Sequence, residues 1–252
     1  ILRNLVNYVA DYRPTAAVKT AVIGDADLAG FFEALGLQTG PAENANCFVV
    51  DARALGEQAS RIRAAVENGG GALVHGVTDD TLAIVKEMVG MDLAVTVPYL
   101  EERTHCVKAA TSWTRSDSPK DLVEYYDGIL THQPFEPNYD PLISGIANAD
   151  LDWDGVPMFD QGIEIPGMDP VDAGEDRNIL ISNWRIDWSK CDFGGEYSHE
   201  GRDRRRADWF INRDPVLLKV KCGKGYFLLC QLHLPAGGVK GRRVASQLLT
   251  AM

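Results

Sequence analysis

The sequence predicts an α/β fold, with a doubly wound, mostly parallel sheet and a loop-rich β excursion in its second half. Three observations lead to this prediction. Strand and helix patterns alternate with short connections over the first 90 residues. Residues 115–178 are instead rich in Pro, Asp, Gly and Asn. Strand patterns then return near the C-terminus, where two apolar runs flank a glycine-containing turn.

Apolar runs at 19–24, 46–51 and 72–75 predict the strands of the first half. A parallel strand is covered on both faces, so its residues are continuously apolar rather than alternating. A further short strand is expected at about 37–39.

Amphipathic helices follow these strands in the predicted order. The first begins after Asp25 and closes at Gly36, and the others cover about 55–67 and 79–89. Asp25 and Thr78 are the expected N-caps, because a short side-chain oxygen can accept a hydrogen bond from the first turn of a helix.

The second half predicts fewer regular elements. Strands are expected at 93–100, 105–111 and 178–184, with a short helix near 120–126. Residues 216–232 predict a hairpin whose turn is 222–225. A helix over 243–252 ends the chain. We therefore expect one domain over 13–252 with a loop-rich insertion at about 91–215.

Residues 1–12 predict an amphipathic helix whose apolar positions match those of 244–252. One interpretation is two unrelated helices. The other is that 1–12 is the last helix of an upstream copy of the same domain, so that the chain is one unit of a multidomain protein. The first residue, Ile1, agrees with the second interpretation.

Composition disfavours several classes of partner. The chain has 25 Lys and Arg residues against 36 Asp and Glu residues, a net charge of −11, and this sign repels nucleic acid and anionic lipid. The sequence contains no stretch of 18 consecutive apolar residues, so no membrane span is predicted. The five cysteines form no C-x-x-C pair, and Cys47, Cys222 and Cys230 are expected to be buried packing residues. The compartment is not predicted.

Polar residues follow the predicted strands, at the sheet edge where doubly wound proteins bind ligands. They include Asp51 and His75, and His233 follows the last predicted strand. These three residues are the candidate catalytic set of a small-molecule hydrolase or transferase. No G-x-G-x-x-G motif is present, so a dinucleotide site is not expected.

The element order over 19–90 and 216–252 resembles class I glutamine amidotransferases, and Gln231-Leu232-His233 is similar to the Q-F-H phrase that carries their catalytic His. The departures affect chemistry. His75-Gly76 stands where the nucleophilic Cys is expected. After His233 come Leu234 and Pro235, so the orienting acid expected two residues after the His is lost. Asp51-Ala52-Arg53 has no glycine for an oxyanion hole. The resemblance therefore implies a fold of this kind without amidotransferase activity.

The phrase at 141–153, PLISGIANADLDW, resembles amidotransferase-like (GATase-like) accessory domains of bacterial glycoside hydrolases of the β-galactosidase and family 2 kind. Gly223-Lys224-Gly225 and Gln247-Leu248-Leu249 match later parts of that pattern. The resemblance implies a flavodoxin-like, non-catalytic domain for interdomain packing, oligomerisation or glycan contact. Its partners would be other domains of a multidomain glycosidase, a second copy of the chain, or carbohydrate.

Two further features are candidate binding residues. Asp150, Asp152 and Asp154, followed by a glycine, match the first half of a calcium-binding loop, although Gln161 stands at the twelfth position; the alternative is a solvated acidic turn. Trp153 and Trp188 have polar and acidic neighbours, so they are the tryptophans expected to be exposed and able to stack on sugar rings. No other cofactor is predicted.

Overall fold

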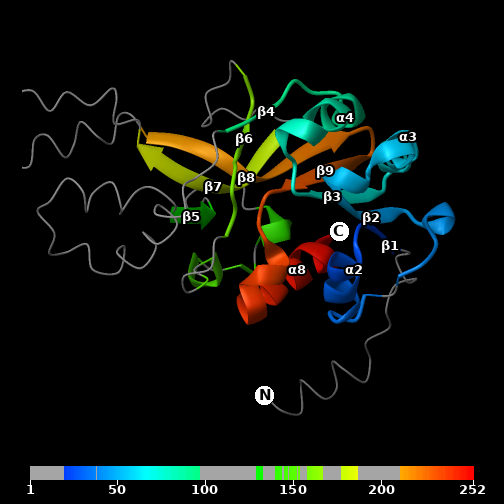
Figure 1. Ribbon diagram of the computed structural model, residues 1–252, viewed down its shortest axis with the longest axis horizontal. Coiled ribbons are helices and arrows are strands. Elements are labelled where there is room, and N and C mark those ends of the chain that lie inside the picture. Colours follow the sequence, from blue (N-terminus) through cyan, green and yellow to red (C-terminus); the bar gives the residue numbers. More distant parts are fainter. Residues whose placement is uncertain are drawn as a thin grey trace, which may run out of the picture.

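The computed structural model describes residues 20–37, 39–96, 129–132, 140–143, 145, 146, 148–151, 153, 158–166, 177–186 and 211–252. Its centre is a seven-stranded sheet in the order β1-β2-β3-β9-β8-β7-β5 (Figure 1). Strands β1 (Thr20–Ile23), β2 (Cys47–Asp51), β3 (Gly71–His75) and β9 (Gly225–Cys230) are parallel neighbours.

The other half of the sheet is antiparallel. Strand β8 (Ile211–Cys222) pairs with β9, β7 (Arg177–Ile186) pairs with β8, and β5 (Ile129–His132) pairs with β7. Two short strands, β4 (Ala94–Val95) and β6 (Ile163–Glu164), form a separate antiparallel pair. The predicted α/β class is confirmed, and the predicted parallel pairing holds for the half built from β1, β2, β3 and β9.

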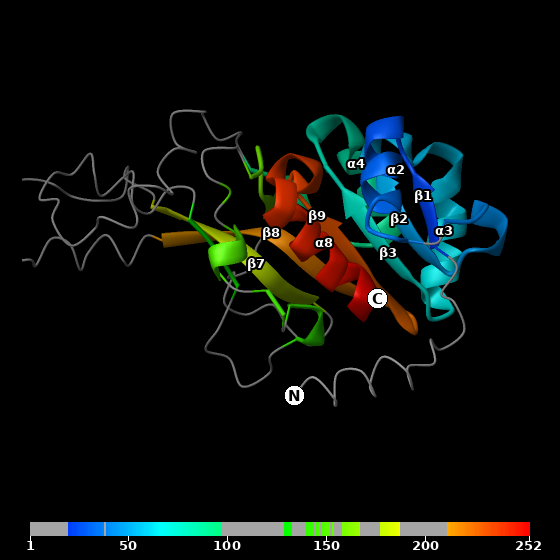
Figure 2. The ribbon, with the colours of Figure 1, turned by 90° about the horizontal axis from the view of Figure 1, so that it is seen from below.

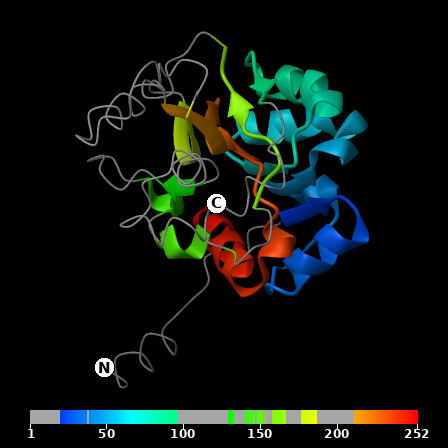
Figure 3. The ribbon, with the colours of Figure 1, turned by 60° about the vertical axis from the view of Figure 1, so that its left-hand side comes forward.

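Helices cover both faces of this sheet (Figures 1 and 3). Helices α2 (Ala26–Glu33) and α8 (Gly238–Ala251) lie on one side, where they contribute Phe32 and Leu248 to one buried cluster. Helices α3 (Ala59–Glu67) and α4 (Asp79–Val89) lie on the other and contribute to a second cluster. Single-turn 3₁₀ helices connect the elements: η1 (Ala42–Asn44), η2 (Ala52–Ala54), η3 (Gly56–Gln58), η5 (Pro141–Ile143), η6 (Asn148–Leu151) and η9 (Leu234–Gly237).

The predicted N-caps Asp25 and Thr78 are confirmed, whereas α3 begins at Ala59, after η2 and η3, rather than at about 55. The Asp25 carboxylate accepts a hydrogen bond from Leu28 N at 2.9 Å and so caps α2. At the start of α4, Thr78 N donates to Thr81 Oγ1 at 2.9 Å. The last helix, α8, begins at Gly238 rather than at the predicted Arg243. Its first turn therefore contains two glycines, Gly238 and Gly241, although glycine has a low helix propensity. Gly241 is needed there, because a Cβ at this position would lie 2.2 Å from Leu234 O.

The predicted hairpin is also confirmed, since β8 and β9 are joined at Cys222 and Gly225. Gly223 has a positive φ of 58°, and a Cβ there would lie 2.5 Å from Glu67 O. Lys224 N donates to Glu67 O at 3.0 Å. The turn is therefore docked on the end of α3.

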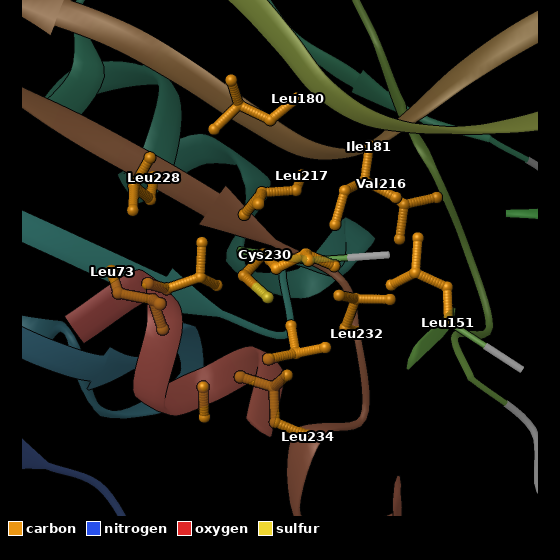
Figure 4. Close-up of a cluster of buried hydrophobic side chains, with 14 of the residues drawn as sticks. Leu73, Leu151, Leu180, Ile181, Val216, Leu217, Leu228, Cys230, Leu232 and Leu234 are labelled. Atoms are coloured by element: carbon orange, nitrogen blue, oxygen red, sulfur yellow. The ribbon is translucent and has the colours of Figure 1, made fainter. Parts of the chain in front are cut away.

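The described residues of 140–153, a segment that contains the phrase behind the second resemblance, pack across the α8 side of the sheet. Their apolar side chains are buried in the cluster that Figure 4 shows around Leu217, Cys230 and Leu232; they are Leu142, Ile143, Ile146, Leu151 and Trp153. Figure 2 shows α8 over the same face. The phrase is therefore part of the core.

Several predicted elements lie outside the described residues: the helix at 1–12, the strand at 105–111 and the helix near 120–126. Of the strand expected at 93–100, the structure describes the short β4. At the predicted short strand near 37–39, Thr39 forms one parallel bridge with Thr20.

Candidate functional site

The candidate catalytic residues meet at the carboxyl ends of the parallel strands, as the sequence predicts. Asp51, the last residue of β2, is in register with His75, the last residue of β3, and His75 is in register with Cys230 of β9. His233 follows β9 and is close enough to affect the charge state of His75. The edge therefore brings together Asp51, His75 and His233.

Asp51 is occupied by its neighbour Arg53. The buried carboxylate accepts from Arg53 Nη2 at 2.6 Å and from Arg53 Nε at 3.0 Å, and it also accepts from Arg53 N at 2.9 Å. These hydrogen bonds from the Arg53 side chain hold the pKa of the Asp51 carboxyl below its ordinary value. The same guanidinium lies 3.7 Å from Asp25 Oδ2. Asp51 is thus an ionised, fully paired group rather than a base available to a substrate.

His75 is held by the backbone of the neighbouring strand end. Its Nε2 lies 2.8 Å from Leu232 O. Because a carbonyl oxygen only accepts hydrogen bonds, Nε2 carries the proton of the neutral ring. Burial has the largest influence on the pKa of His75 and lowers it below the ordinary value. The hydrogen bond to Leu232 O and the charge of Asp51 raise this pKa, whereas the charges of His233 and Arg53 lower it. His75 is therefore a neutral side chain that links β3 to the chain after β9.

His233 has an acidic partner that the sequence does not reveal. Its Nε2 lies 3.3 Å from Asp160 Oδ2, and its backbone N donates to Met158 O at 2.8 Å. Two residues after His233 the sequence has Pro235, and the acid beside the ring comes instead from the 158–166 segment. No local pattern announces it, since the two residues are far apart in the chain and meet only through the fold.

The buried side chain of Gln231 closes the turn that follows β3. Its Oε1 accepts from Val77 N at 2.8 Å, and its Nε2 donates to Val77 O at 2.7 Å. One amide thus satisfies both backbone polar groups of Val77. The sequence shows Gln231 as part of a motif but gives no indication of this role.

Four backbone N–H groups in the turns after β3 and β2 have acceptors within the protein. Gly76 N donates to Cys230 O at 3.0 Å, Val77 N to Gln231, and Thr78 N to Thr81. In the turn after β2, Arg53 N donates to Asp51. Stabilising an oxyanion requires donors aimed at the position of the developing charge. These four donors point to protein atoms instead.

The cysteines of the described strands are free and buried, as predicted; they are Cys47, Cys222 and Cys230. Cys230 is in register with His75, but burial raises the pKa of its thiol to about 12. A nucleophilic cysteine needs its thiolate form. Cys230 is therefore a core residue and does not replace the missing nucleophile.

The structure corrects the expectation that Trp153 is exposed. The side chain is buried, its Nε1 donates to Asp150 O at 2.8 Å, and the ring lies against Gly237, where a Cβ would approach it to 2.7 Å. A ring enclosed in this way has no face for a sugar. Trp188, the other predicted stacking residue, lies outside the described residues.

Of the predicted calcium ligands, Asp152 and Asp154 also lie outside the described residues. Asp150 is buried, and its Oδ1 lies 3.4 Å from Arg243 Nη1, so a cation of the protein itself already faces this carboxylate. Gln161 Nε2 donates to Thr96 O at 2.8 Å. Within the described ranges, no group of three or more His, Cys, Asp or Glu side chains is arranged to hold a metal ion.

No model of a known protein family matches this sequence, and no curated protein is significantly similar to it. Among the helices that the structure describes, none is long and apolar enough to cross a membrane.

Proposed function

We propose that this chain is a non-catalytic, GATase-like accessory domain of a carbohydrate-active enzyme of the glycoside hydrolase class. In this proposal it serves interdomain packing, oligomerisation or glycan contact, and hydrolysis belongs to another part of the protein. The observation that carries the non-catalytic part is the occupation of the backbone donors at both turns, Gly76 and Val77 after β3 and Arg53 after β2. With these three donors occupied, acyl transfer at this edge lacks the stabilisation that they would give to an oxyanion.

The flavodoxin-like arrangement within this proposal is supported by the faces on which the helices lie. Helix α2 follows β1 and covers one face, whereas α3 follows β2 and covers the other. Thr39 lies between α2 and β2 in the chain and forms a parallel bridge with Thr20 of β1. A chain that passes outward from β1 to Thr39 and returns to β2 reverses its winding at this point, as in the flavodoxin strand order.

The test uses the whole reading frame that contains this chain. The proposal expects a glycoside hydrolase catalytic domain in that reading frame. Deleting residues 13–252 is expected to leave hydrolysis per catalytic domain in place while lowering thermal stability, changing the oligomeric state in size-exclusion chromatography, or weakening retention on immobilised glycan. A reading frame without a glycosidase domain, or a deletion that changes none of these three properties, would contradict the proposal.

The second candidate is a small-molecule hydrolase that uses Asp51, His75 and His233. The 3.3 Å approach of Asp160 to His233 favours it, because a carboxylate that orients an imidazole is half of a general-base system. It requires the pair to act on a substrate at the strand ends. A His233→Ala variant with unchanged stability and lost turnover would establish this function in place of the first.

A further inference from the structure

Three neighbouring contacts join the end of β3 to the chain that follows β9. His75 Nε2 contacts Leu232 O, the Gln231 amide pairs with Val77, and Gly76 N donates to Cys230 O. We call this set of contacts the β3–β9 clamp. The clamp holds residues 75–77, which precede α4, against residues 230–232, which precede η9.

The side chain of His75 is the titratable part of this clamp. Among the described residues, the charged groups that face it are Asp51 of β2, Arg53 of η2 and His233 beside η9. Asp51 is already paired with Arg53, and Arg53 also faces Asp25. His233 Nε2 in turn lies 3.3 Å from Asp160 Oδ2.

A positive charge on the His75 ring is therefore poorly stabilised in the closed clamp. In the neutral ring Nε2–H is used by Leu232 O, so an incoming proton must go to Nδ1. The ring is mostly enclosed, and the opposite charge nearest to it is shared with a guanidinium. Opening the clamp would expose the protonated ring to water, where its charge is solvated.

We propose that the β3–β9 clamp is a pH-sensitive junction, which opens locally when His75 takes up a proton. Opening frees the N–H groups of Gly76 and Val77 and loosens the start of α4, while the centre of the sheet stays folded. In the open form these two N–H groups are free to donate hydrogen bonds, whereas at neutral pH they are bonded to Cys230 and Gln231.

Thermodynamic linkage determines how steeply the opening depends on pH. His75 in the open form titrates near its ordinary value of 6.5, and in the closed form below it. Between these two values the open form binds one more proton than the closed form. Its population relative to the closed form therefore rises about tenfold for each pH unit of acidification. Above about pH 7 the ratio does not depend on His75.

The experiment is amide hydrogen exchange followed by NMR from about pH 7.5 to about pH 4.5, corrected for intrinsic exchange rates. Protection of Gly76 and Val77 is expected to be constant above about pH 7, to fall about tenfold per pH unit below it, and to level off once the pH is below the lowered pKa of His75 in the closed form. Protection of Leu73, farther back in β3, is expected to lack this dependence. If Leu73 loses protection in parallel, the molecule unfolds globally and the proposal is wrong.

Two variants separate His75 from other acid-sensitive groups. His75→Gln retains a side-chain nitrogen able to donate to Leu232 O but does not titrate, so the pH dependence of Gly76 and Val77 is expected to vanish. In His233→Gln the repelling neighbour is gone, so His75 in the closed form titrates nearer to its ordinary value and the total loss of protection is smaller. An unchanged pH dependence in His75→Gln, or an unchanged total loss in His233→Gln, would overturn the proposal.

Discussion

The carboxyl edge of the parallel strands has two halves that are stabilised differently. At the ends of β1 and β2, charged groups face water: the side chains of Arg53 and Asp25 are 70% and 59% exposed. At the ends of β3 and β9, a neutral amide is enclosed: Gln231 is 4% exposed. Exposed ion pairs are weakened by solvent, whereas a buried amide leaves unsatisfied partners when it is removed. The stability of this edge is therefore expected to depend more on Gln231 than on the exposed ion pairs.

The largest effect is expected from Gln231→Leu. The substitution keeps the volume but leaves the buried N–H and C=O of Val77 without partners, which costs about 2–5 kcal/mol of unfolding free energy. Urea denaturation followed by circular dichroism measures the loss.

Gln247→Leu is the matched control, because its amide makes a single long contact of 3.5 Å with Pro141 O near the surface. It is expected to change stability by less than about 1 kcal/mol. Equal effects of the two substitutions would remove the distinction between the two halves of the edge.

A smaller effect is expected from Arg53→Ala, which leaves the buried Asp51 carboxylate with one backbone donor. Allowing for the exposure of the guanidinium, the loss at neutral pH is about 1–2 kcal/mol in urea denaturation. Arg61→Ala, which breaks a pair at 3.4 Å with the exposed carboxylate of Glu43, is the control and is expected to lower stability less than Arg53→Ala does.

The effect of Arg53→Ala also depends on pH in a definite direction. The folded-state pKa of Asp51 is lowered from 3.8, so the stability contributed by the pair is present above this value and is lost as pH falls through the folded pKa. The difference between wild type and Arg53→Ala is therefore expected to shrink below about pH 4. A difference that grows in acid would show that Asp51 is not the group concerned.

The smallest effect is expected from Asp25→Ala, which removes the N-cap of α2. The expected loss is about 1 kcal/mol, seen as a shift of the urea midpoint without a change in slope. Asp27→Ala, in the first turn of the same helix but not at the N-cap, is expected to have less than half this effect. A larger loss in Asp27→Ala would contradict the capping assignment.

The sequence was sufficient to predict the parts of the fold that depend on local order. Continuous apolar runs marked β1, β2 and β3, and side-chain oxygens at Asp25 and Thr78 marked helix starts, because these signals act between near neighbours in the chain. The convergence of Asp51, His75 and His233 was also predictable, since parallel strands end at one edge.

Contacts between distant segments could not be predicted in the same way. Asp160 reaches His233 from a segment without regular periodicity, so no spacing rule relates the two residues. Trp153 has acidic neighbours in sequence, yet Gly237 leaves room for its ring inside the core. In both cases the deciding partner lies far along the chain.

The central proposal is that the backbone N–H groups of Gly76, Val77 and Arg53 are occupied and that the chain therefore does not catalyse acyl transfer. Ammonia release from L-glutamine, together with hydrolysis of an aryl acetate ester, tests it most directly with purified wild type and His233→Ala. We expect both proteins to give the rate of the buffer alone. Turnover by the wild type that disappears in a folded His233→Ala variant would contradict the claim.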